Sequence, residues 1–183
     1  MMPYLVLLIA ALTRLVPHAL HGVGLNFTGV GGGLLFFGAR RPRWQALIAA
    51  GVMAATDVYL TVHVYASAFH ATGYLVTWAW YAGVCLIGAS QLRKPGFWRV
   101  AGAVAASATS FFLLSNLMVW LTSGMYPHSL TGVGACFALA LPFYANDLVS
   151  TGLTATVLFG LPVAAEQIVS SWRTVMEHNQ RLD

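Results

Sequence analysis

The sequence predicts an all-α integral membrane protein, a single transmembrane domain over residues 1–183 built as a bundle of about six helices. Of its 183 residues, 58% are hydrophobic and only 8% are charged, and the mean hydropathy is +0.74. A soluble domain carries about 25% charged residues because its surface faces water, so most of this surface is expected to face lipid. About 20 apolar residues cross a bilayer. The chain therefore has room for six spans and for no sizeable soluble domain.

Three apolar stretches near the N-terminus predict the first three spans. Residues 3–16 end at Pro17, and they lack the basic region and cleavage site of a signal peptide, so we expect a retained helix. Residues 22–39 are glycine-rich, and their Gly29–Gly33 pair is typical of helices that pack closely in lipid. Residues 44–66 follow a cluster of arginines and form the third stretch.

The remaining spans are predicted in the second half of the chain. Residues 74–92 run up to a basic turn, and residues 97–121 form the clearest helix, which ends at a Thr-Ser-Gly turn. The apolar region 130–172 is interrupted by Pro142 and by Asn146–Asp147. Proline removes a helical hydrogen bond, so we expect a short, partly buried helix at about 130–144 and a sixth span at about 148–170.

The basic residues predict the orientation of the bundle. With six spans, eight of the nine Lys and Arg residues fall on one side: Arg40, Arg41, Arg43, Arg93, Lys94, Arg99, Arg173 and Arg181. Excess Lys and Arg mark cytoplasmic connections, which predicts a bacterial inner-membrane protein with both termini in the cytoplasm. A seventh span would move the last two arginines outside, so six is the better number. Arg14, near the outer end of the first span, is the exception.

The three outer connections are rich in histidine and aromatic residues and contain no acidic residue. They carry His18, His21, His70, His128, Asn26, Tyr126 and Cys136. This contrast with the cationic inner side is the most function-like feature of the sequence, and it predicts a site on the outer side.

Asp57 and His63 lie within the span 44–66, Asp57 near the bilayer midplane and His63 in the outer third. An ionisable group in hydrocarbon is costly unless it faces the bundle interior or water, so each is a candidate site residue. The alternative for Asp57 is a structural role, as a protonated group or one hydrogen-bonded to a neighbouring span.

Further candidates lie at a similar depth in two other spans. Asn116 and Trp120 are four residues apart and share a helix face. Trp78, Trp80 and Tyr81 precede Cys85. If these aromatic residues mark the outer interface, Cys85 lies about one turn below it; if the span starts at Tyr74, Cys85 is deeper. The common depth of Asn116, Trp120 and His63 predicts a shared cavity, although Asn and Trp also serve as helix contacts and interface residues.

The two cysteines allow two interpretations. Cys85 and Cys136 have neither zinc-finger nor CxxC spacing. A buried cysteine is usually a small apolar side chain, whereas a thiol near histidines is also a soft metal ligand.

Absent motifs exclude several functions. No GxxxxGK[ST] loop occurs, so the chain has no ATP site of that kind, and HExxH and GxSxG are absent too. The positive charge lies in short clusters between apolar stretches rather than on a nucleic-acid-binding face.

Three segments carry a resemblance to known proteins: RLVPHALHGVGLNFTGVGGGLLFFGA, SNLMVW and MYPHSLTGVGACFALALPFYAND. With the six-helix outline, they make the chain similar to a family of small, uncharacterised bacterial membrane proteins. The outline also resembles the S components, or substrate-capture subunits, of energy-coupling-factor vitamin transporters. That resemblance implies an outward-opening cavity for a vitamin-like micronutrient, beneath the loops after spans one, three and five. It also implies either docking on a separate energising ATPase module or solitary action.

Among such ligands, cobalamin (vitamin B12) matches the side chains best, by resemblance to the BtuM-type cobalamin component. Its cobalt accepts histidine or thiolate ligands. We therefore hypothesise that Cys85, or else Cys136, ligates cobalt, with His18, His21, His70 or His128 nearby. A thiolate on cobalt would labilise an opposing cyanide, so ligand exchange on cyanocobalamin is conceivable without further catalytic residues.

Three other functions compete with solute capture. The abundance of small and aromatic residues is also typical of an accessory subunit in a larger membrane complex. An intramembrane enzyme using His63 and Asp57 is disfavoured, because six residues separate them by roughly 240° around a helix. Proton-coupled transport through Asp57 is the third.

Overall fold

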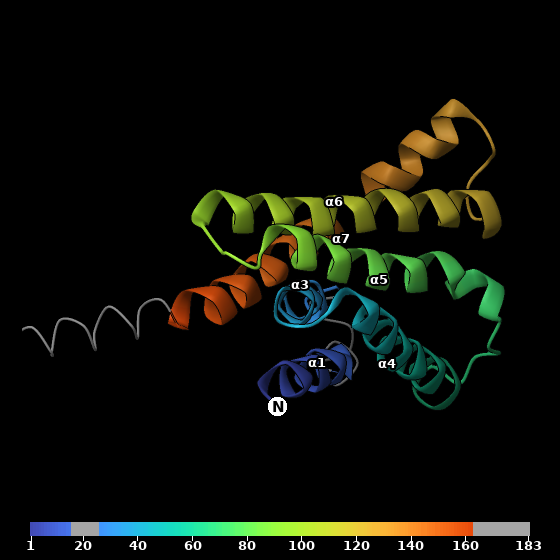
Figure 1. Ribbon diagram of the computed structural model, residues 1–183. Helices are drawn as coiled ribbons and strands as arrows, with labels where there is room; N and C mark the ends of the chain where they lie inside the picture. Colours follow the sequence, from blue (N-terminus) through green and yellow to red (C-terminus); the bar gives the residue numbers. More distant parts are fainter. Residues whose placement is uncertain (16–25, 163–183) are drawn as a thin grey trace, which may run out of the picture.

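The computed structural model describes residues 1–15 and 26–162, and these form helices and turns without a strand. Six helices make up the bundle: α1 (Met2–Leu12), α3 (Val30–Arg40), α4 (Ala46–Tyr59), α5 (Leu75–Gln91), α6 (Phe97–Thr122) and α7 (Leu130–Ala155). Short helical turns extend or connect them: η1 (Thr13–Leu15), η2 (Arg43–Gln45), η3 (Leu60–Val64), η4 (Ala71–Tyr74) and η5 (Thr156–Gly160). The predicted all-α bundle of six helices is confirmed (Figure 1).

Three of the helical segments are long and apolar enough to cross a membrane. They are Arg43–Val64, Phe97–Thr122 and Leu130–Gly160, with 22, 26 and 31 residues. The others are shorter, and α3 has only 11 residues. At about 1.5 Å per residue, α3 covers roughly half of a hydrocarbon core about 30 Å thick. Residues 26–29, directly before α3, are non-helical, with Asn26 and Phe27 exposed and Thr28 and Gly29 half-buried.

Helix α3 is the centre of the fold, and every one of its residues except Arg40 is buried. It packs against α1, α5 and α7 (Figure 1). Its glycines allow this, because a Cβ on Gly38 would lie 1.9 Å from the carbonyl oxygen of Cys85 in α5, and one on Gly33 would lie 2.6 Å from the Cβ of Ala10 in α1. The close packing predicted for the Gly29–Gly33 pair is found at Gly33, whereas a Cβ on Gly29 would lie at an ordinary contact distance of 3.5 Å from Thr13 Oγ1.

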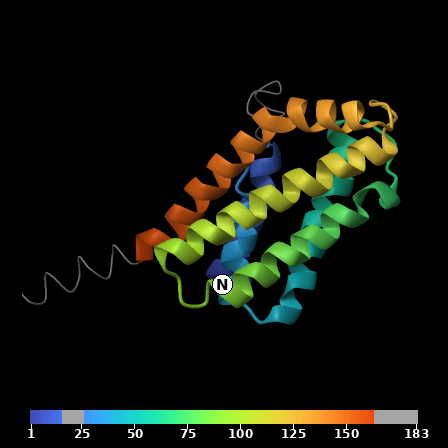
Figure 2. The same ribbon diagram turned by 90° about the horizontal axis from the view of Figure 1, so that it is seen from above.

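Helix α7 corrects the prediction of two separate helices at 130–144 and 148–170. It runs unbroken from Leu130 to Ala155 and contains Pro142. Figure 2 shows that it bends near its middle rather than ending there. One proline removes one backbone hydrogen bond, and a bend accommodates this in a bundle where neighbouring helices pack on the turn. Asn146 and Asp147 stay within the helix, and Ser150 Oγ donates to the Asp147 carbonyl at 3.1 Å.

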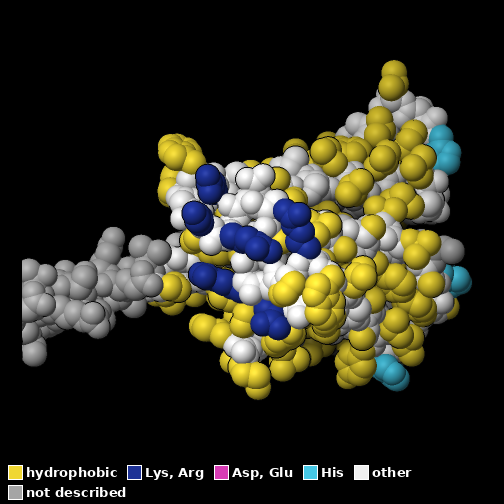
Figure 3. Space-filling view, viewed as in Figure 1, with side chains coloured by type: hydrophobic (Ala, Val, Ile, Leu, Met, Phe, Trp, Pro, Cys, Tyr) yellow, Lys and Arg dark blue, Asp and Glu magenta, His cyan; other side chains and the backbone are white. Residues whose placement is uncertain are grey.

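In the part of the chain that the structure describes, the Lys and Arg side chains other than Arg14 lie at one end of the bundle and the histidines at the other, as the sequence predicts (Figure 3). The basic side chains at the C-termini of α3 and α5 and the N-termini of α4 and α6 gather at one end, and the histidines lie at the other (Figure 3). Arg173 and Arg181 lie outside the described residues. We call these two poles the basic end and the histidine end.

Candidate functional site

The one ion pair among the described residues lies inside the bundle. Asp57 on α4 is 3% exposed, and its Oδ1 pairs with Nη2 of Arg14, which follows α1. Nη1 of Arg14 donates to Thr56 Oγ1 at 2.9 Å and to the Met53 carbonyl at 3.3 Å. Arg14, the one basic residue predicted on the outer side, is therefore neutralised within the bundle by Asp57.

Asp57 receives two further donors from α5. Trp78 Nε1 donates to Oδ2 at 2.9 Å, and the Tyr81 hydroxyl lies 3.4 Å from Oδ1. The Asp57 carboxylate thus joins α1, α4 and α5, as in the structural interpretation of this residue. His63 is exposed and its ring lies 5.2 Å from that of Tyr59, so His63 and Asp57 occupy different faces, as their spacing predicts.

Two adjoining cavities lie beside this cluster. The larger, which we call the α6–α7 cavity, has a volume of about 240 Å³. The smaller, which we call the Arg14 cavity, has a volume of about 100 Å³ and includes Trp80 and Tyr81 in its wall. Both cavities are lined by Asn26, Phe111 and Asp147. These shared residues place the two side by side, and Arg14 lies in the wall of the smaller one.

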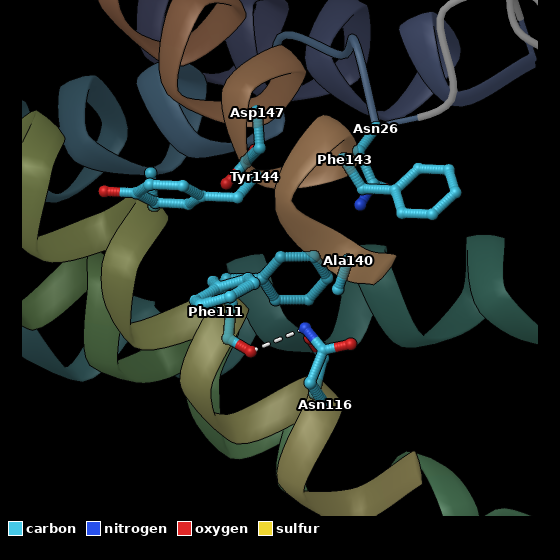
Figure 4. A pocket seen from close by; sticks show the side chains of 10 residues that line it. Asn26, Phe111, Asn116, Ala140, Phe143, Tyr144 and Asp147 are labelled. Carbon is cyan, nitrogen blue, oxygen red and sulfur yellow. Dashed lines mark hydrogen bonds between the residues drawn. The ribbon is translucent and has the colours of Figure 1, made fainter. Parts of the chain in front are cut away.

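The walls of the α6–α7 cavity come from one face of each helix. On α7 they are Ala140, Phe143, Tyr144 and Asp147, and on α6 they are Ala108, Phe111, Phe112, Ser115 and Asn116. Spacings of three and four residues place side chains on one helix face. Figure 4 shows the α7 residues facing Phe111 and Asn116 across the cavity. Four of the five α6 residues lie in the half of that helix nearer the histidine end, whereas the α7 residues lie near the middle of their helix.

Asp147 is the notable polar group of the cavity. Its side chain is 6% exposed, and Oδ2 has no hydrogen-bond partner among the residues described. Two other polar groups of the wall are engaged: the Tyr144 hydroxyl bonds Thr109 Oγ1 at 3.0 Å, and Asn116 Nδ2 donates to the Phe112 carbonyl at 2.7 Å. Asp147 therefore offers a free acceptor next to both cavities.

The segment before α3 closes the cavities from a third side. Asn26 adopts φ 62°, and the Gly29 amide donates to Thr13 Oγ1 at 2.9 Å. Non-helical backbone at membrane depth is tolerated where it is covered by protein or lines a cavity. Here Asn26 lines both cavities and Thr28 lines the smaller one.

The structure brings together some of the predicted site residues. Asn26 and Asn116 line the α6–α7 cavity, Tyr81 lines the Arg14 cavity, and Trp78 binds Asp57. Sequence reasoning missed Arg14 and Asp147 as site residues. The signal for Asp147 was the spacing 140, 143, 144 and 147, which describes one helix face.

The other predicted residues make local contacts at the histidine end. His70 is exposed, with Nδ1 3.2 Å from the Ala68 carbonyl. His128 Nε2 lies 3.0 Å from the Trp120 carbonyl, and Trp120 Nε1 donates to the Pro127 carbonyl at 3.0 Å. Neither the two cavities described above nor the Asp57 cluster includes these residues or the half-buried Tyr126. His18 and His21 lie outside the described residues.

Both cysteines are free and buried. Cys85 lies where α5 touches α3 at Gly38, and Cys136 Sγ lies 3.5 Å from the Asn116 carbonyl. Within residues 1–15 and 26–162, no three His, Cys, Asp or Glu side chains gather closely enough to hold a metal ion. Ligation of cobalt by either cysteine stays a prediction.

Comparison with known proteins places the chain in a family. No curated protein matches the sequence, and no solved structure matches it. Residues 1–172 match the model of the DUF6580 family, whose function is unknown. Because the match covers nearly the whole chain, this helical, membrane-like protein belongs to the DUF6580 family.

Proposed function

We propose that this protein captures a small solute in the α6–α7 cavity, as the binding part of a membrane uptake system. The observation that carries the proposal is the buried Asp147 carboxylate, whose free Oδ2 lies between two adjoining cavities. Ligand sites are typically concave and largely apolar, with a few convergent polar groups. Ionisable groups inside membrane bundles commonly mark substrate pathways.

The arrangement of the ends supports capture from outside the cell. The basic end would face the cytoplasm, with both chain termini there, and four of the five α6 residues of the cavity lie in the half of that helix nearer the histidine end. The likeness to vitamin-capturing S components supports the same direction. Energy would then come from a separate ATPase module or from the solute gradient, since the chain carries no phosphate-binding loop.

The size of the cavity bears on the solute. A cavity of about 150 Å³ holds benzene, so about 240 Å³ suits a single substituted ring. Cobalamin is far larger than the drug-sized ligands that occupy pockets of about 300–1,000 Å³. The geometry therefore favours a smaller solute, and cobalamin remains the candidate suggested by resemblance alone.

An accessory role in a larger complex is the second candidate function. Ala101, Gly102 and Ala105 on α6 are exposed, although their spacing is typical of residues that let helices pack closely. A partner helix on this face would explain the pattern. Such a subunit would co-purify with a protein partner and retain no small molecule.

Co-purification tests the proposal. The full chain is purified from cells grown in rich medium supplemented with cobalamin, and retained small molecules are identified by mass spectrometry. Ala140→Phe fills the cavity, whereas Ala138→Phe adds the same ring to an exposed position on the same helix. We expect a solute with the native protein and with Ala138→Phe but not with Ala140→Phe. A protein that retains no solute, or an Ala140→Phe variant that retains it fully, would contradict solute capture.

A further inference from the structure

We propose that the captured solute is an organic cation, with its positive group beside Asp147 and its body among the aromatic rings of the α6–α7 cavity. This inference rests on the proposed function and specifies the chemical class of its substrate. Three features lead to it: the balance of buried charges, the aromatic walls, and the scarcity of metal ligands.

Among the described residues, the interior holds two buried acidic side chains, Asp57 and Asp147, and only one of them is paired with a cation. Arg14 is paired with Asp57, so these two groups neutralise each other. Asp147 is the other buried acidic residue in the described chain, and it has no cationic partner there. An unpaired carboxylate in a low-dielectric interior is costly. A cation entering the cavity would offset that cost, whereas an anion would add a second negative charge.

Aromatic rings line the space that such a cation would enter. Phe111, Phe112, Phe143 and Tyr144 line the cavity, and Trp80 lines its smaller neighbour. These rings also contact one another: the ring centroids of Phe112 and Tyr144 are 4.9 Å apart, and those of Trp80 and Phe111 are 4.7 Å apart. Ring faces attract ammonium groups electrostatically, and one carboxylate with several rings suits amines and quaternary ammonium ions.

The wall is less suited to a bare metal ion. Divalent cations such as Ca²⁺ take six to eight oxygen ligands. Apart from Asp147, the side-chain oxygens of the wall are the amides of Asn26 and Asn116 and the hydroxyls of Ser115 and Tyr144. An organic cation instead uses the apolar surface that the rings provide.

Binding of charge-matched probes to the full chain in lipid nanodiscs tests the inference. The probes are benzyltrimethylammonium, neutral benzyl alcohol and the anion benzoate, and binding is measured by isothermal titration calorimetry. We expect the cation to bind at least about tenfold more tightly than the neutral probe, because a desolvated ammonium over aromatic ring faces gains about 2 kcal/mol and tenfold corresponds to about 1.4 kcal/mol. Asp147→Asn should remove this preference. Ser150→Ala, a buried change one turn further along α7, should keep it.

Moving the carboxylate across the cavity provides a rescue. Asn116 lies on α6 and lines the same cavity as Asp147, at its other end (Figure 4). The double variant Asn116→Asp with Asp147→Asn should regain the preference for benzyltrimethylammonium, which a merely structural role of Asp147 would not produce.

The outcomes separate this inference from the proposed function. Equal binding of cation and neutral probe, or an unchanged preference in Asp147→Asn, would overturn the organic-cation assignment. If neutral or anionic probes bind and Ala140→Phe abolishes their binding, solute capture stands and only the charge assignment fails. If no probe binds and no solute co-purifies, both fail.

Discussion

Replacing Arg14 with methionine should destabilise the protein more than any surface substitution. The change keeps an apolar chain of similar length but removes the guanidinium that pairs with Asp57 and bonds Thr56 and the Met53 carbonyl. Asp57 would remain 3% exposed without a counter-charge. Breaking a buried ion pair by removing one partner costs about 3–5 kcal/mol, so Arg14→Met should lower the free energy of unfolding by about that amount.

A double-mutant cycle separates the pair from general packing loss. Asp57→Asn keeps an oxygen for the Trp78 N–H but leaves Arg14 without its counter-charge. The double variant Arg14→Met with Asp57→Asn buries neither charge, so its cost should be smaller than the sum of the single costs by about 2 kcal/mol, within the range for contacting residues. Arg93→Met is the control, because Arg93 is exposed and its loss should change stability by less than about 0.5 kcal/mol.

Equilibrium unfolding in mixed detergent micelles, followed by tryptophan fluorescence and circular dichroism, measures these differences. Strictly additive single costs would refute the reasoning, because the two groups would then not interact. A single Arg14→Met cost no larger than that of Arg93→Met would refute it as well.

Three further predictions concern helix packing and the polar cluster. Gly38→Ala should lower the midpoint of thermal unfolding by several degrees or prevent folding, because the new Cβ would lie 1.9 Å from the Cys85 carbonyl oxygen. The control Gly83→Ala should be tolerated, because a Cβ on Gly83 meets open space. Trp78→Phe removes the N–H that donates to Asp57 and should cost about 1–3 kcal/mol, measured by the same detergent titration. Both cysteines are buried and free, so a maleimide should modify them slowly in the folded protein and fully after denaturation; rapid modification of either in the native state would contradict this packing.

Helix boundaries followed the sequence where strong chain-breaking signals flank an apolar run. The span predicted at 97–121 is the helix Phe97–Thr122, and the span predicted at 74–92 is the helix Leu75–Gln91. The glycine-rich stretch 22–39 gave less information, since helix α3 begins only at Val30. Glycine tolerates both helical and extended backbone, so composition alone did not indicate where the helix starts.

The site was harder to predict because it depends on contacts between distant parts of the chain. Arg14 and Asp57 are 43 residues apart, and only the packing of α1 on α4 brings them together. One clue existed: the single cation on the outer side and the single acid near the midplane could neutralise each other. Asp147 was missed because Asn146–Asp147 was interpreted as a helix break, whereas the continuous helix turns its carboxylate into the cavity.

The most direct test of the account is the accessibility of the two ends of the bundle in intact cells. In a cysteine-free background, Ser115→Cys in the α6–α7 cavity, His128→Cys at the histidine end and Lys94→Cys at the basic end are treated with a membrane-impermeant thiol reagent. The account predicts modification of the first two in intact cells and of Lys94→Cys only after lysis. Modification of Lys94→Cys in intact cells, with protection of His128→Cys, would contradict a solute cavity that opens to the outside.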